Sequence, residues 1–167
     1  SRIAVADPGA GLVHVYDPSR RQSLALQACG EAALVEPVAA VFFGEGLYVS
    51  DSAASAIRIF NFDGGCEGGW VLDQGSRPTG LAADTARSRL YVADVGTHQV
   101  LGFDPKGTPV LRFGGRGPAA GEFNYPTWLA LDADGNLYVT DTLNFRVQIF
   151  DPDGKLLSAF GDQGDGS

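Results

Sequence analysis

Four aspartates recur along the chain at nearly constant spacing, and carboxylates repeated in this way could bind a metal ion or act in acid–base chemistry. Asp7, Asp51, Asp94 and Asp141 lie 44, 43 and 47 residues apart, and each ends a short apolar run such as Leu-Tyr-Val-Thr-Asp. An aspartate at a strand end also accepts backbone hydrogen bonds and tolerates unusual dihedral angles. Because the same residue recurs at the same place in every repeat, we predict that these four aspartates are structural.

Other acids follow the same pattern. A second set stands ten residues after the repeated aspartates, and a third follows the first strand of two repeats; these are Asp17, Asp104 and Asp151, and Asp84 and Asp132. Nine of the twenty acidic residues therefore occupy expected turns, and much of the net charge of −8 is architectural.

The groups that most often accompany carboxylates in metal or catalytic sites are scarce. The chain has two histidines. His14 falls within an expected strand and His98 in an expected loop, and we interpret both as surface or loop residues. The polar side chains on the expected inner strands include no histidine; they are Glu36, Thr79, Asp84, Thr127 and Asp132. We predict no catalytic, cofactor-binding or metal-binding residue in this chain.

One segment superficially resembles a calcium loop. It reads Asp-Ala-Asp-Gly-Asn over residues 132–136. An EF-hand needs a bidentate glutamate at its twelfth position, and this chain has Leu143 there. A hairpin turn explains the segment better.

The elements that carry these residues are short strands. Between Phe123 and Gly161, four apolar runs are separated by Asp-Gly and Pro turns; the runs are Pro126–Leu131, Asn136–Thr140, Arg146–Phe150 and Leu156–Phe160. Aromatic and β-branched residues in such runs are typical of an antiparallel meander. The sequence therefore predicts a four-stranded antiparallel sheet here.

The same unit recurs through the whole chain with a period in the low to mid forties. Four strands per period of this length are the signature of a β-propeller blade. The strand count gives fifteen strands, or three and three-quarter blades. The expected blades are an incomplete one at residues 1–30, then 31–74, 75–114 and 115–161, with 162–167 as the start of a linker to a next blade.

The last unit closely resembles the NHL repeat. It has the Phe123-x-x-Pro126 opening, the run Asp-Gly-Asn-Leu-Tyr-Val-Thr-Asp-Thr, the group Asn144-x-Arg146-Val147, a Phe-Asp turn and a terminal Phe-Gly. The resemblance weakens toward the N-terminus, where the Asn and Arg positions hold Thr and Gln, and then two alanines. It implies an all-β propeller, usually six-bladed, and an arginine at 146 that pairs with a nearby acid such as Asp141.

Fewer than four blades do not easily close a ring, because sheet faces would stay exposed to water. We therefore expect an incomplete arc of about four blades of a six-bladed ring. Missing blades or self-association would complete it.

Composition limits the class of partner. Only twelve Lys and Arg residues are spread through an acidic chain, so attraction to phosphates is weak and a nucleic acid partner is not expected. No long apolar run is present, so no membrane span is expected. A periplasmic or extracellular location is favoured over others.

The two cysteines are Cys29 and Cys66. Alignment of the repeats places them toward opposite ends of the outermost strands in adjacent blades. Such positions are too far apart for easy bridging, so we predict two thiols in preference to a disulfide.

The NHL resemblance implies a binding platform, since most such propellers bind partners and a minority of related propellers are enzymes. Tyr125 and Trp128 are the best candidates for contact with a partner, whereas Phe123 is expected in the core. We predict a non-catalytic protein-binding or scaffolding module. The alternative is part of an extracytoplasmic metal-dependent hydrolase or lyase, lactonase-like or amidating-lyase-like, with its site in absent blades.

Overall fold

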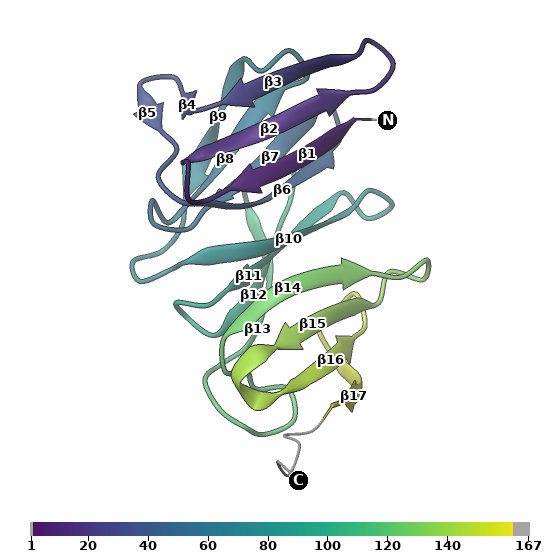
Figure 1. Ribbon diagram of the computed structural model, residues 1–167. Helices are drawn as coiled ribbons and strands as arrows, with labels where there is room; N and C mark the ends of the chain where they lie inside the picture. Colours follow the sequence, from purple (N-terminus) through teal and green to yellow (C-terminus); the bar gives the residue numbers. More distant parts are fainter. Residues whose placement is uncertain (1, 162–167) are drawn as a thin grey trace, which may run out of the picture. The chain divides into compact units, whose positions relative to one another are not determined.

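The computed structural model describes residues 2–161, and within them the fold is all-β (Figure 1). One short 3₁₀ turn, η1 (Thr142–Asn144), interrupts the strands. The larger sheets are antiparallel meanders, three of them with four strands and one with three. The predicted fold class of four-stranded antiparallel blades is confirmed. Residues 162–167, the expected linker, lie outside the described residues.

The chain divides into two compact units, with the boundary between Thr79 and Gly80. In the first unit a three-stranded sheet, a two-stranded hairpin and a four-stranded sheet follow one another. Their strands are β1 (Ile3–Asp7), β2 (Leu12–Asp17) and β3 (Gln22–Leu26); β4 (Ala28–Cys29) and β5 (Ala32–Ala33); and β6 (Pro37–Phe43), β7 (Gly46–Asp51), β8 (Ala56–Asn61) and β9 (Cys66–Val71).

The second unit holds two four-stranded sheets, apart from the first two residues of β10. Their strands are β10 (Pro78–Asp84), β11 (Arg89–Asp94), β12 (Gln99–Phe103) and β13 (Pro109–Gly114); and β14 (Pro126–Leu131), β15 (Leu137–Asp141), β16 (Arg146–Phe150) and β17 (Leu156–Phe160). In the last sheet Leu137 pairs with Phe150 and Val147 with Phe160, as expected for consecutive hairpins.

One backbone feature repeats in all four large sheets. The residue four positions after each repeated aspartate is left-handed, with φ of 64° at Gly11, 49° at Ser55, 58° at His98 and 55° at Phe145. Three of these are not glycine, and that conformation is costly for residues with a Cβ. The hairpin turn therefore imposes its geometry on whatever side chain stands there, which fixes the direction of the exposed residues in these turns.

Each unit has its own apolar core. In the first unit it includes Val13, Val15, Leu47, Val49 and Phe60, with Ala4 and Ala6 packed against them. In the second unit it is formed by Ala82, Tyr91, Val100, Phe123, Leu137, Val139 and Phe150. Alternate residues of neighbouring strands supply both cores, which is how a pleated sheet presents one face to its neighbour.

The first unit departs from the prediction after β3. The hairpin β4–β5 was not predicted, and it lies between the incomplete first sheet and the sheet β6–β9. Cys29 therefore does not lie at the end of a blade's outer strand. It lies on the hairpin, which packs against β8 and β9.

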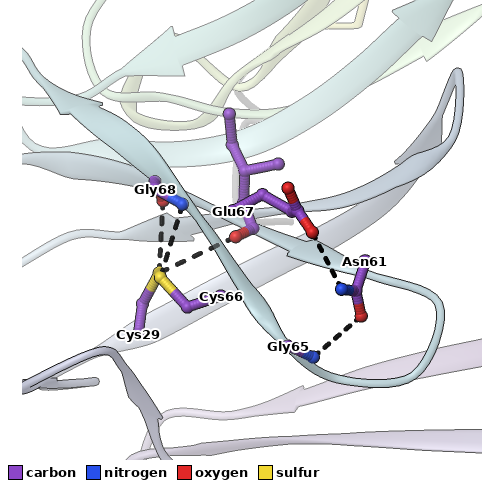
Figure 2. Close-up of a disulfide and its surroundings, with 7 residues drawn as sticks. Cys29, Asn61, Gly65, Cys66, Glu67 and Gly68 are labelled. Atoms are coloured by element: carbon purple, nitrogen blue, oxygen red, sulfur yellow. Dashed lines mark hydrogen bonds between the residues drawn. A yellow bond between two sulfur atoms is a disulfide. The ribbon is translucent and has the colours of Figure 1, made fainter.

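The prediction of two thiols is wrong, because Cys29 and Cys66 form a disulfide (Figure 2). Their Cα atoms are 4.8 Å apart, within the ordinary range for a bridge. No strand lies between β9 and β10 or between β13 and β14, whereas the hairpin β4–β5 follows β3 and brings Cys29 across the start of β9. The Gly68 amide donates a hydrogen bond to the Cys66 sulfur at 3.3 Å. The disulfide thus attaches the hairpin β4–β5 to β9, the outermost strand of the sheet β6–β9.

No helix among residues 2–161 has the length and apolar character needed to cross a membrane.

Candidate functional site

Tyr125 stands immediately before β14 with a left-handed backbone conformation that hydrogen bonds to its amide and carbonyl stabilise. Its φ is 61°, and its side chain is 45% exposed. Its amide donates to Nδ1 of His98 at 3.2 Å, and its carbonyl accepts the Thr142 amide at 3.1 Å. The His98 and Tyr125 rings meet edge to face, with centroids 5.1 Å apart. The surrounding structure therefore holds an exposed aromatic ring in one place.

The contact also engages one ring nitrogen of His98, because Nδ1 accepts the hydrogen bond from the Tyr125 amide. His98 lies in the turn between β11 and β12, as expected, but it is buried, so it is a loop residue and not a surface residue. His14, by contrast, is exposed on β2.

Trp128 lies on β14, three residues after Tyr125, and is 54% exposed. Its amide donates to the Thr140 hydroxyl at 2.8 Å, next to an irregularity in the pairing of β14 with β15. The Thr127 hydroxyl lies 2.8 Å from that of Thr140 and 2.7 Å from that of Thr142. These hydroxyls fix the start of β14, so Trp128 is presented from a rigid strand.

Phe123 precedes them and is fully buried, as expected of a core residue. Its ring packs on those of Phe113 and Phe150, with centroids 6.2 and 5.5 Å away. The three aromatic residues at the start of β14 therefore differ in burial. Phe123 anchors the segment, and Tyr125 and Trp128 face solvent.

Asp141 is completely buried and its carboxylate is fully engaged. Oδ1 accepts a hydrogen bond from the Asn124 backbone amide at 2.6 Å. Oδ2 accepts hydrogen bonds from Nε of Arg146 at 2.7 Å and from the side-chain Nδ2 of Asn144 at 2.8 Å. The expected ion pair between Arg146 and Asp141 is present. Both oxygens of this carboxylate already accept hydrogen bonds from the protein, so neither is available to bind a ligand.

Arg146 extends this cluster into the preceding loop. Its Nη2 donates to the carbonyls of Ala119 and Glu122 at 2.7 and 2.9 Å. Gln148, which sequence reasoning missed, is also fully buried; its Nε2 donates to the Glu122 carbonyl and its Oε1 accepts the Gly121 amide. A polar residue in the apolar run Arg-Val-Gln-Ile-Phe was the available signal. Together the side chains hold the loop that leads to Tyr125.

The other repeated aspartates also accept backbone hydrogen bonds. Asp51 accepts the amides of Val35 and Glu36, Asp94 those of Gly96 and Thr97, and Asp7 that of Ala10. Asp51 and Asp94 are fully buried, whereas Asp7 is half-buried. The structure does not bring these residues together; each serves its own sheet.

The residues of the apparent calcium loop form a turn. Asp132 accepts the amides of Asp134 and Asn136 at 3.0 and 2.8 Å and the Asn136 side chain at 2.9 Å. The Asn136 side chain, together with these amides, holds the pKa of the Asp132 carboxyl below its usual value. Within residues 2–161, no three His, Cys, Asp or Glu side chains are grouped so that they could hold a metal ion.

Comparison with known proteins identifies the repeat. The pattern of the NHL repeat matches residues 123–150. Among curated protein sequences, none matches the chain.

Solved structures share the fold. A catalytically inactive virginiamycin B lyase from Staphylococcus aureus, solved with quinupristin, matches 99% of the chain with a TM-score of 0.78 and 14% identity. A gluconolactonase from Xanthomonas campestris matches 98% with a TM-score of 0.75 and 20% identity. A nidogen/laminin complex matches 96% with a TM-score of 0.72 and 24% identity. The chain spans only 54–59% of the length of these proteins. At such identities the likeness shows the fold alone.

Proposed function

Because the chain is a β-propeller segment that carries an NHL repeat, we propose that it is a non-catalytic module that binds a protein partner through Tyr125 and Trp128. The observation that carries this proposal is the fixed position of an exposed tyrosine. Both its amide and its carbonyl are hydrogen-bonded, so its ring is ordered before any partner arrives. Aromatic residues presented in this way lose little conformational entropy on binding.

Two further observations support a protein partner. Tyrosine and tryptophan are the residues most enriched among binding hot spots, and both lie here within four residues on one entry segment. One of the similar structures is a nidogen/laminin complex, which joins two proteins. The net charge of −8 disfavours nucleic acid.

The proposal can be tested with peptides selected from a displayed random library against the immobilised 167-residue chain. Tyr125→Ala and Trp128→Ala should each weaken binding of the selected peptides at least tenfold, because truncating a hot-spot aromatic costs about 2 kcal/mol or more. Val110→Ala, which truncates another exposed apolar residue of the same unit, is the matched control. Normal circular dichroism would show that the fold is intact. Unchanged binding in both variants would refute the proposed surface.

The second candidate is part of a metal-dependent extracytoplasmic hydrolase or lyase with its site in absent blades. Similarity to a virginiamycin B lyase and to a gluconolactonase favours it. Lactone hydrolysis by a polypeptide that joins this chain to the remaining blades, with added zinc or calcium and lost on chelation, would favour this candidate over the binding module.

We also propose that the four large sheets act as consecutive blades of a single propeller segment of a six-bladed ring. The blades would span residues 1–30, 31–74, 75–114 and 115–161. The Cys29–Cys66 disulfide supports a periplasmic or extracellular location, because such bonds persist in oxidising compartments.

A further inference from the structure

A hollow of about 340 Å³ lies in the first unit, where the turn between β2 and β3 meets the turn between β8 and β9. Its lining comes from β2, from β3, from these two turns and from Arg2. Clefts that hold ligands start at about 300 Å³. A hollow of this size therefore suits a small molecule.

Arg2 forms a fixed wall of the hollow. Its Nε donates to Oδ2 of Asp17 at 3.1 Å, its Nη1 donates to the Phe62 carbonyl at 2.8 Å, and its guanidinium lies 5.1 Å from the centroid of the Phe62 ring. Hydrogen bonds from the Ser19 hydroxyl and from Arg2 hold the pKa of the Asp17 carboxyl below its usual value, so this ion pair stays ionised. The charges of the wall thus neutralise each other.

The same contact occurs in the second unit, where Arg89 takes the place of Arg2 and donates to the carbonyl of Pro152. The segment that leads to Arg89 lies along the turn after β14, since Nη2 of Arg87 donates to the Asp134 carbonyl at 3.2 Å. The chain that enters this strand of the repeat therefore follows the inner turns. The hollow belongs to the outer turns, which the structure describes completely.

Three polar side chains of the lining have no counterpart in the second unit. They are Arg20, Gln22 and Ser23, and the corresponding positions there hold Gly107, Pro109 and Val110. The sheet β10–β13 forms without these polar groups, so the fold of the repeat does not require them. Polar residues that a fold does not need are candidates for binding a ligand.

Two charged groups of the lining are available to a ligand. Within residues 2–161, neither the guanidinium of Arg20 nor the carboxylate of Asp63 takes part in a hydrogen bond or an ion pair, and both residues are exposed. A guanidinium binds a carboxylate through two parallel hydrogen bonds, and a carboxylate binds an ammonium group. Leu24 and Phe62, which are 37% and 42% exposed, add apolar surface beside them.

The balance of charge selects the class of ligand. Two arginines and two aspartates line the hollow, so its formal charge is zero. A simple anion such as phosphate would be attracted by Arg20 and repelled by Asp63. A zwitterion with an apolar group matches all three kinds of surface.

We propose that this hollow binds a free α-amino acid with an apolar side chain. The carboxylate of the ligand pairs with Arg20, its ammonium group pairs with Asp63, and its side chain rests on Leu24 and Phe62. The site lies in the first unit and goes beyond the binding of a partner at Tyr125.

Titration of the 167-residue chain with L-leucine, followed by the NMR shifts of its backbone amides, tests the proposal. Leucine should give saturable shift changes confined to residues 15–24 and 62–64. N-acetylleucine lacks the ammonium group and leucinamide lacks the carboxylate. Each should bind at least about tenfold more weakly than leucine, because each leaves one charged group of the hollow without its partner.

Two variants assign the charged groups. Arg20→Gln should weaken leucine at least about tenfold and leave the weaker binding of leucinamide unchanged. Asp63→Asn should weaken leucine by a similar factor and leave N-acetylleucine unchanged. Arg21→Gln, at a neighbouring arginine that does not line the hollow, and Asp153→Asn, in the corresponding turn of the last sheet, are the matched controls and should bind leucine as the wild type does.

The absence of a saturable shift with leucine up to its solubility limit would overturn the proposal. Equal binding of leucine and its two analogues, which needs no variant to measure, would also overturn it, as would an equal effect of Arg20→Gln and Arg21→Gln. Tighter binding of inorganic phosphate than of leucine would show an anion site and overturn it as well. Tyr125→Ala should leave leucine binding unchanged, so this result is independent of the outcome for partner binding.

Discussion

The two units of the molecule stabilise the same repeat in different ways. In the second unit, Asp141 anchors a cluster of side chains in which Asn144, Arg146 and Gln148 all take part. In the first unit, the corresponding Asp51 accepts the backbone amides of Val35 and Glu36. The residues that would match Asn144 and Arg146 are Ala54 and Ala56.

One interaction of the repeated aspartate is common to both units, and the others differ between them. Both aspartates bond to the amides of the segment that enters the innermost strand, at Glu36 in one unit and Asn124 in the other. The first unit lacks the arginine, and it carries the Cys29–Cys66 disulfide across its outer strand. Both sheets therefore share a buried aspartate that accepts backbone hydrogen bonds. The ion pair with Arg146 is present only at Asp141 and not at Asp51.

Asp141→Ala should have the largest effect on stability. It removes one partner of a buried ion pair and leaves the Asn124 amide and the Arg146 guanidinium without their main acceptor. We expect the free energy of unfolding to fall by about 3–5 kcal/mol. Urea denaturation followed by circular dichroism measures it.

Asp51→Ala is the matched variant in the first unit. It leaves two backbone amides without an acceptor but no charge unpaired, so the expected loss is about 1–3 kcal/mol. An equal or larger loss than for Asp141→Ala would show that the ion pair adds nothing.

Removal of the disulfide should have an effect between those of Asp141→Ala and Asp51→Ala. The bond joins residues 37 apart in the sequence, for which loop-closure entropy gives a stabilisation of about 3–4 kcal/mol as an upper value. Cys29→Ala with Cys66→Ala should therefore lower the unfolding midpoint, and a reducing agent should do the same to the wild type. Amide hydrogen exchange should accelerate in β4, β5 and β9 and stay unchanged in β14–β17. A uniform change along the chain would contradict this local role.

Much of the fold could be predicted from the sequence because the repeat is visible at two levels. Strand runs end in aspartate, and turns contain Asp-Gly or Pro, so the four strands predicted for the last unit are present with shifts of at most one residue. The burial of Phe123 and the pairing of Arg146 with Asp141 followed from their place in the last repeat.

The remainder depends on contacts that the repeat does not encode. The hairpin β4–β5 contains two strands of two residues each, too short to show a periodic pattern. Its position decides the state of both cysteines, so an alignment to other repeats could not find the disulfide. The burial of His98 likewise depends on Tyr125, which is 27 residues later.

The smallest expected effect concerns the outer turns, where the chain offers its own control. Asp104 accepts the amides of Lys106 and Thr108 through one oxygen, and Asn61 accepts those of Asp63 and Gly65 in the same way. The hydrogen bond from the Thr108 amide is the main cause that holds the pKa of Asp104 below its usual value of 3.8. Asparagine makes the same bonds without titrating.

Asp104→Asn should therefore keep the turn's hydrogen bonds and change mainly the pH dependence of the unfolding midpoint. A lowered pKa in the folded state means that the ionised carboxylate stabilises the fold above about pH 4, and that this contribution is lost as the pH falls through the folded pKa. The difference in unfolding midpoint between wild type and Asp104→Asn should be present at pH 7 and smaller at pH 3. The reverse substitution, Asn61→Asp, should introduce a weaker pH dependence in the first unit, because the new carboxylate would lose the hydrogen bond from Asn61 to Glu67 and lie beside that acid. A difference independent of pH would mean that the turns of both units depend on hydrogen-bond geometry alone and that the charge at Asp104 does not contribute.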